Sequence, residues 1–258
     1  MGAGIHGEGI GNFGGARERA VEADARWRSR SLTATLAGSM EGRYKAMYIP
    51  KAFQVSDSAV LDAFITHNSF AMLVSTVDGT PFATHLPLIL DRTQSSQGVL
   101  LGHVARANPH WRAFDGQQEA LAIFHGPHAY ISPSWYTTSP AVPTWNYAAV
   151  HVYGVPHIVE DEEWLANLVD RLVALYEAGM LSPWPGMLPA DFKANLLKAI
   201  VGFTMEITRV EGKFKLGQNR PLGDQLRVVG HLEANADPIA QALGELTKQQ
   251  LGQGARAS

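Results

Sequence analysis

Hydrophobic and polar residues alternate along several short segments of the chain, a pattern typical of half-buried β-strands. The segment 70–77 is apolar and β-branched, and Asp78-Gly79 directly after it is a strong signal for a tight turn. The chain is therefore expected to return in a second strand over 81–90. Further strands are predicted over 98–105, 119–125, 148–159 and 203–210.

Apolar residues spaced three and four apart predict helices that come mainly after these strands. The clearest covers 161–178, where Trp164, Leu168 and Leu172 share one face and Gly179 ends the pattern. Other helices are predicted after the capping residue Ser56, over 192–201 and over 237–251. Many short strands with helices inserted late favour an α+β fold, in which peripheral helices surround an antiparallel β-barrel.

The first 46 residues differ from the rest of the chain. They hold nine of the 25 glycines and a basic segment between Arg17 and Arg30. This composition fits a flexible tail, an amphipathic arm, or sequence upstream of a misassigned start, because Met47-Tyr48-Ile49-Pro50 reads like a natural beginning. We therefore predict a disordered extension over 1–46 and one folded domain over 47–258.

The overall composition is that of a globular protein, with 46% hydrophobic and 17% charged residues in 258, enough apolar side chains for a large core. No stretch approaches the roughly 20 consecutive apolar residues of a membrane-spanning helix. The chain has no cysteine, which excludes disulfides, thiolate catalysis and cysteine-ligated metals and fits a cytoplasmic protein. No membrane partner is expected.

The charge balance argues against direct binding of nucleic acid. The net charge is −3, and without the first 46 residues 14 Lys and Arg remain against 19 Asp and Glu, a net charge of −5. A groove that holds nucleic-acid phosphates normally shows a basic excess. The folded part has none.

Polar residues gather in four segments where a barrel would otherwise be apolar. These segments are Thr84-His85-Leu86-Pro87, Gly102–Trp111, Pro143–Tyr147 and Lys215–Pro221. Together with Met47–Pro50 and Gly126–Pro133, they follow one another in the order found in the PaiB family, which the chain resembles over about 47–229. That family is described as FMN-binding negative transcriptional regulators.

The resemblance implies a split β-barrel related to pyridoxamine-phosphate oxidase and to flavin reductases. It also implies a homodimer that binds FMN in a groove shared by two subunits. The cofactor-binding residues that the resemblance points to are Thr84, His85, Leu86, His103, Arg106, Ala107, Asn108, Trp145, Asn146, Gln218 and Arg220.

The residue types in this set suit the parts of FMN. Arg106 and Asn108, at a strand-to-helix junction, offer a guanidinium and an amide for the phosphate, and free N–H groups of a short helix after Asn108 would add to them. Thr84 and His85 offer polar groups to the edge of the flavin ring. Trp145 can flank the ring and Asn146 can bond to its pyrimidine portion. Gln218 and Arg220 lie far along the chain and could come from the partner subunit.

Each candidate also has a purely structural interpretation, which the sequence leaves open. His85 and His103 fit core histidines that bond to nearby backbone, and Arg106 fits a surface ion pair. Trp145 fits a packing aromatic whose N–H bonds to a loop carbonyl. The segment 218–220 fits an ordinary turn before a proline.

Other chemistries find less support in the sequence. His125-Gly126-Pro127-His128 places two histidines three apart, but Pro127 excludes a regular helix there and no acid stands at the spacing of a zinc site, so no metal site is predicted. Haem bound by a histidine stays open as a lower alternative. The chain has no Gly-x-Ser-x-Gly elbow, Walker loop or dinucleotide fingerprint.

The function predicted from the resemblance is negative regulation of transcription by an FMN-binding protein. The charge balance makes indirect regulation through the flavin site the preferred form, with direct DNA contact supported only by the family description. The alternative is a flavin-dependent oxidoreductase that acts on a small molecule. The sequence assigns no catalytic residue and leaves open whether the protein is an enzyme.

Overall fold

The computed structural model describes residues 46–257, and the side chains of residues 46–252. Eight antiparallel strands form one sheet in the order β3-β2-β6-β7-β8-β5-β4, with β1 paired to β8. The extension predicted over 1–46 lies outside the described residues. The strands are β1 (Gln54–Val55), β2 (Phe70–Val77), β3 (Thr80–Pro87), β4 (Ile89–Asp91), β5 (Val99–Ala105), β6 (Ala120–Ile131), β7 (Thr144–Val159) and β8 (Ile200–Lys215).

Two long strands, β7 and β8, form the centre of this sheet. Each has 16 residues, and they pair from Tyr147 opposite Lys215 to Val159 opposite Gly202. The first half of β8 also pairs with β5, and the second half with β1. One continuous pair of strands therefore belongs to the barrel at one end and extends beyond it at the other.

The barrel is completed on the other side by β6, β2 and β3. Only Leu121–Ile123 of β6 pairs with β2, so the later part of β6 has β7 as its one sheet neighbour among the described strands. The predicted α+β fold with an antiparallel split barrel and peripheral helices is confirmed.

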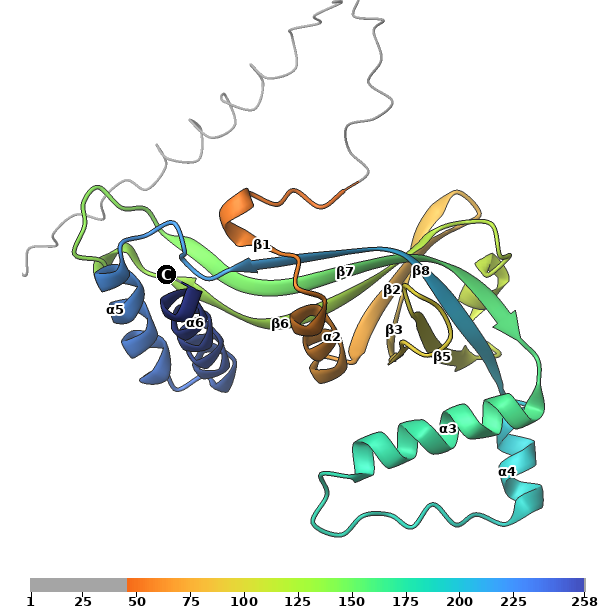
Figure 1. Cartoon of the computed structure of the whole chain (residues 1–258). Coiled ribbons are helices and arrows are strands. Elements are labelled where there is room, and N and C mark those ends of the chain that lie inside the picture. The colour runs from red at the N-terminus through yellow and green to blue at the C-terminus, as the bar shows by residue number, and fades with distance from the viewer. Residues whose placement is uncertain (1–45, 258) are drawn as a thin grey trace, which may run out of the picture. The chain divides into compact units, whose positions relative to one another are not determined.

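The α-helices lie at the two ends and on one face of the sheet (Figure 1). α5 and α6 pack side by side near the extended end of β6, and α3 and α4 follow the far end of β7. The α-helices are α2 (Ser58–His67), α3 (Glu162–Glu177), α4 (Ala190–Leu197), α5 (Leu222–Glu233) and α6 (Pro238–Ala257); the 3-10 helices are η1 (Lys51–Phe53), η2 (Pro109–Ala113) and η3 (Pro133–Trp135).

The alternation along β7 explains how the sheet divides into a core face and an outer face. Ala148, Val150 and Val152 are buried in the main core, whereas Tyr147 before them and His151 among them point to the opposite side. This period of two is what a strand imposes on its side chains. One face of the sheet therefore carries the core, and the other carries polar and aromatic residues.

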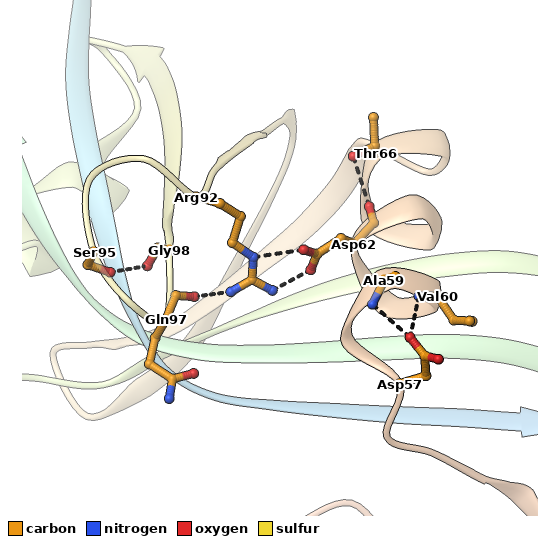
Figure 2. A network of polar contacts seen from close by, with 9 residues as sticks. All are labelled: Asp57, Ala59, Val60, Asp62, Thr66, Arg92, Ser95, Gln97 and Gly98. Atoms are coloured by element: carbon orange, nitrogen blue, oxygen red, sulfur yellow. Dashed lines mark hydrogen bonds and ion pairs between the residues drawn. The ribbon is translucent and has the colours of Figure 1, made fainter.

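A network of polar contacts joins α2 to the turn between β4 and β5 (Figure 2). Arg92 donates from Nε to Oδ2 of Asp62 at 2.9 Å and from Nη2 to Oδ1 of the same carboxylate. It also donates to the carbonyl oxygen of Gln97. The hydrogen bonds from Arg92 to Asp62 raise the pKa of the guanidinium, which stays charged.

Asp57 caps α2 by accepting from the N–H groups of Ala59 and Val60.

Several element boundaries differ from those predicted. The helix predicted over 192–201 ends at Leu197, because Ile200 already pairs with Ala105 in the sheet. The strand predicted over 119–125 continues through Gly126 and Pro127, where a bulge shifts its register. The strand predicted over 203–210 extends to Lys215, and α5 was not predicted.

Among the described residues, no helix combines the length and the hydropathy that are needed to cross a bilayer.

Gly154 provides a test of the β7–β8 pairing. It lies at the register shift of β7, and a Cβ there would come within 2.2 Å of the carbonyl oxygen of Glu206. We expect Gly154→Ala to lower the free energy of unfolding by about 1–3 kcal/mol, measured by urea denaturation, because β8 must move. Gly223→Ala in α5 is the matched control: its Cβ meets open space, so stability should be unchanged or rise by up to about 1 kcal/mol. Equal stabilities of both variants and wild type would contradict this packing.

Candidate functional site

A buried histidine organises the first group of predicted site residues. His110 is 0% exposed, and its ring nitrogens bond to the hydroxyls of Ser75 (Nε2, 2.5 Å) and Thr84 (Nδ1, 2.8 Å). Asn108 donates from Nδ2 to Oγ1 of Thr84 at 3.1 Å. Burial lowers the pKa of His110, so the ring is neutral at pH 7. Thr84 and Asn108, predicted to bind different parts of FMN, therefore lie side by side.

Asn108 also caps the short helix η2. Its Oδ1 accepts from the backbone N–H of His110 at 3.0 Å, and Pro109 at the first helical position has no N–H to offer. The helix predicted after Asn108 is therefore present, but at least one of the N–H groups expected to be free for an anion is already bonded to Asn108.

Arg106 and Ala107 are exposed in the turn between β5 and η2. The Arg106 guanidinium donates from Nε to the carbonyl oxygen of Lys198 (2.9 Å) and from Nη2 to that of Ile200 (3.1 Å). These bonds hold it against the junction of α4 and β8. Its Nη1 makes no hydrogen bond to another described residue, which leaves one side of the fork available to a ligand.

The other predicted residues at the barrel end face three different directions. His85 is exposed on the face of β3 opposite Thr84, with its ring 6.4 Å from that of Phe70. Leu86 is buried in the main core. His103 lies on β5 and faces a cleft beside α3 and α4, with its Nδ1 buried and without a hydrogen-bond partner among the described residues.

A second group of predicted residues lies where β7 begins and β8 ends. Trp145 is 55% exposed on the outer face, and its carbonyl oxygen accepts from Nζ of Lys215 at 2.6 Å. Asn146 is buried on the core side, beside Gly217. Gln218 closes the turn after β8: its side chain accepts from the N–H of Leu216 and donates to the carbonyl oxygen of Phe214.

Arg220 is held over the ring of Tyr136, with the guanidinium carbon 4.4 Å from the ring centroid. The neighbouring segment is fixed by Asp224, a fully buried carboxylate of α5. Asp224 accepts from the N–H and the hydroxyl of Thr137, both at 2.8 Å, and from the hydroxyl of Thr138. These bonds lower the pKa of Asp224 to about 2. The loop that leads into β7 is therefore tied to α5.

The outer face of the sheet carries large apolar and cationic side chains that no described helix covers. Its members, placed on one side by the strand registers, are Phe70, Tyr130, Trp145, Tyr147, Lys213 and Lys215. Phe70, Tyr130 and Trp145 are 67%, 48% and 55% exposed.

Lys213 lies between the rings of Tyr48 and Tyr147, 5.3 and 5.4 Å from their centroids. Burial, followed by the charge of nearby Lys213, lowers the pKa of Lys215.

Arg106 of the first group and the whole second group stand at opposite ends of β8. Ala105, next to Arg106, pairs with Ile200 at the start of β8, whereas Tyr147 pairs with Lys215 at its end. With a rise of about 3.3 Å per residue, this separation is roughly 50 Å along the strand. Within one chain, the predicted residues do not form one site.

No group of three or more potential metal ligands occurs among the described residues. The rings of His125 and His128 meet edge to face, with centroids 4.7 Å apart, and burial followed by the charge of His128 lowers the pKa of His125.

Comparison with known proteins identifies the family. Residues 47–209 match the family model described as "Putative FMN-binding domain". The chain is also 39% identical, over 207 residues, to "Protease synthase and sporulation protein PAI 2" of Bacillus subtilis, an alignment that covers 80% of this chain and 98% of that one. The chain belongs to this FMN-binding family. The predicted membership of the PaiB family and the predicted FMN cofactor are both confirmed.

More distant members and neighbours extend this picture. An uncharacterised protein of Emericella nidulans, AN0679, is 28% identical over 243 residues, covering 79% of this chain and 97% of that one. The flavocytochrome Anf3 of Azotobacter vinelandii shares the fold, with a TM-score of 0.51 at 16% identity over 64% of this chain and 70% of that one.

The side chains present are chemically suited to the family's cofactor. The barrel end offers an exposed guanidinium at Arg106, and the other end offers an exposed indole at Trp145 with the ammonium of Lys215 beside it. A phosphate binds to the first kind of group, and the flat ring with its polar edge to the second. FMN therefore fits the donor set of this FMN-binding protein.

Sequence reasoning did not select His110, Lys213 or Lys215 as site residues. His110 lies within the polar segment Gly102–Trp111, but nothing in the sequence showed that its ring joins two strands. Lys213 and Lys215 flank the core residue Phe214, and this alternation of cation, aromatic and cation is the signal that could have placed both on the strand face opposite the core.

Acid should release the loop that Asp224 holds. Its folded-state pKa of about 2 lies below its ordinary value near 3.8, so the ionised carboxylate stabilises the fold above about pH 4, and this contribution is lost as the pH falls toward 2. We expect Asp224→Asn to lower the urea midpoint at pH 7, and the difference from wild type to shrink at pH 2.5. A difference that stays constant with pH would contradict the assigned role of the charge.

Proposed function

We propose that two copies of this chain form a homodimer and hold FMN between them, with each copy contributing a different end of its sheet. The observation that supports this most is the separation of the two groups. Arg106, beside the start of β8, and Lys215, at its end, both suit the same cofactor and lie roughly 50 Å apart along this strand. A symmetric dimer places one end of each copy against the other end of its partner and so creates two equivalent sites.

The barrel end would supply the phosphate contacts. Arg106 and Ala107 lie exposed in the turn, and Asn108 is fixed by Thr84 and His110. A guanidinium that already donates two bonds to backbone carbonyls is held in place before a phosphate arrives, so little side-chain freedom is lost on binding. His85, on the exposed face of β3, would meet the flavin edge.

The extended end would supply the ring contacts from the partner copy. Trp145 offers an indole face, and Lys215 beside it offers a positive charge for the electron-rich pyrimidine edge. Arg220, held over Tyr136, adds a second cation. The exposed outer face, with Phe70 and Tyr130, would be covered by the second copy, because exposed aromatic patches of this kind mark interfaces.

FMN supplies one- and two-electron redox chemistry when it is bound. The side chains of this chain bind and orient it: Arg106 neutralises the phosphate, and the lysines of the outer face set the charge around the ring. The neutral His110 is already bonded through both ring nitrogens, and it therefore serves to position Thr84 rather than to exchange a proton.

The biological role that we infer is negative regulation of transcription through the flavin site. The protein would act in the cytoplasm and would not bind DNA directly. The Bacillus subtilis relative is named for protease synthesis and sporulation, which supports a regulatory role. None of the helices among residues 46–257 is rich in basic residues: α5 carries Arg227 and α4 carries Lys193 alone. With a folded part at net −5, recognition of a DNA groove by such helices lacks its electrostatic basis.

Subunit complementation tests the shared site. Arg106→Ala and Arg220→Ala homodimers should each bind FMN about tenfold to a hundredfold more weakly, the scale of about 1.5–3 kcal/mol for a hydrogen bond to a charged group. In a purified heterodimer with one variant in each subunit, one site keeps both arginines. It should bind one FMN per dimer with wild-type affinity by fluorescence titration.

Arg112→Ala is the matched control, because this exposed guanidinium lies 5.7 Å over the Trp111 ring, away from the proposed contacts. Its FMN affinity should equal that of wild type. A heterodimer with no wild-type site, or a monomer in light scattering, would overturn the shared-site proposal.

Indirect regulation predicts weak, non-specific DNA binding. In gel-shift titrations of the purified FMN-loaded protein with a promoter fragment at physiological salt, we expect no binding in the nanomolar range that characterises specific DNA-binding proteins. Tight binding that weakens steeply with added salt would show phosphate contacts and would contradict the indirect mechanism.

A further inference from the structure

An open cleft lies between the α3–α4 hairpin and the sheet, and His103 is the one residue of the two groups described above that lines it. It has a volume of about 930 Å³ and is bounded by α3, α4, the connection 178–189 between them, and the end of β5. We call it the α3–α4 cleft. Its walls are mainly apolar, with Val173, Leu188, Leu197 and Ile200 among them. A volume and a lining of this kind are typical of small-molecule sites.

The connection between the two helices is unusually apolar for an exposed segment. The residues 179–189 include no charged side chain, and Met180, Leu181, Trp184 and Met187 are exposed. Segments of this composition bury their side chains against a ligand or a partner. Since Trp184 also lines the cleft, its indole offers an aromatic surface at the edge of the cavity.

The charges in the cleft favour one sign of ligand. Asp170 and Lys193 neutralise each other, with Nζ of Lys193 at 2.6 and 2.8 Å from the two carboxylate oxygens. The remaining carboxylate, Glu177, accepts from the backbone N–H of Trp184 at 2.7 Å but pairs with no cation among the described residues. The lining therefore carries a net charge of −1.

The one histidine of the lining does not offset this charge. His103 faces the cleft from β5, and burial lowers its pKa, so it is neutral at pH 7. An anion would meet an uncompensated carboxylate and no free cation. The FMN phosphate is therefore excluded on electrostatic grounds, whereas a cation meets Glu177 without repulsion from His103.

From these features we infer that the α3–α4 cleft binds a small organic cation, an amine with an apolar body. The ammonium group pairs with Glu177, and the body lies against Val173, Leu197 and the Trp184 indole. The aromatic face of Trp184 adds a cation–π contribution when the ammonium lies near it. This site stands independently of the proposed flavin site, because none of its charged residues belongs to either flavin group.

Three probes of one shape test the charge preference on the full-length, FMN-saturated protein at pH 7. They are 3-phenylpropylamine, 3-phenylpropan-1-ol and 3-phenylpropionate, which are cationic, neutral and anionic. By isothermal titration calorimetry, we expect the amine to bind about tenfold more tightly than the alcohol and the propionate not to bind, as a charge-assisted contact predicts.

Two variants locate the binding. Glu177→Gln keeps an oxygen for the N–H of Trp184 and should reduce amine affinity to that of the alcohol, whereas Glu163→Gln, an exposed carboxylate of the same helix outside the cleft, should change nothing. Ala174→Trp, at an exposed lining position, should abolish binding of both probes by filling the cleft.

Other outcomes overturn the inference. Equal affinity for the amine and the propionate, or an unchanged amine affinity in Glu177→Gln, would remove the role of charge. Release of FMN by the amine, seen as a rise in free-flavin fluorescence, would show that the cleft belongs to the flavin site. If the Ala174→Trp variant has a lower mass than the wild-type protein in light scattering, the cleft is an interface between copies.

Discussion

The pairing of β7 with β8 is the interaction on which the rest of the structure depends. These two 16-residue strands remain hydrogen-bonded from inside the barrel to the extended end, near α5 and α6. The other strands all attach to this pair: β5 and β1 directly to β8, β6 directly to β7, β4 through β5, and β2 and β3 through β6. The helices α3 and α4 lie between β7 and β8 in sequence. Because a strand pair fixes the distance between its ends, it also fixes how far apart the two groups of flavin-binding candidates lie.

This constraint explains why a residue-by-residue interpretation of the site is incomplete. Thr84 and Asn108 bond to each other beside the buried His110. Trp145 lies at the start of β7, and Arg220 follows the end of β8. Each group has the chemistry for part of FMN, and neither has it for the whole. The outer face that joins them is aromatic and positively charged, whereas the α3–α4 cleft is apolar and acidic. The molecule thus separates surfaces for an anionic cofactor from a cavity suited to a cation.

Much of the fold could be predicted from local patterns. The 161–178 helix is confirmed nearly to the residue, because its spacing is regular and Asp161 caps it by accepting from the N–H of Trp164. Local patterns failed where tertiary contacts decide. The strand β6 passes through Gly126-Pro127 because a bulge absorbs the proline, and Ile200 leaves the predicted helix because β5 offers it a partner.

The candidate site was predictable only in its residue types. The ordered motifs selected Arg106 and Asn108, and the structure brings Asn108 together with Thr84. The sequence could not show that Leu86 enters the core, that His103 faces a different cavity, or that the ends of the sheet are so far apart. These facts depend on strand register and on side-chain direction, which shift by a whole face with a single residue.

Hydrogen–deuterium exchange with and without FMN tests the central claim most directly, because it reports on both ends of the sheet in one experiment. If two copies share the cofactor, FMN should slow exchange in two separate segments, around 84–86 with 105–108 and around 144–147 with 216–220. Protection confined to one of these groups, with the other unchanged, would contradict a site that is built from opposite ends of two chains.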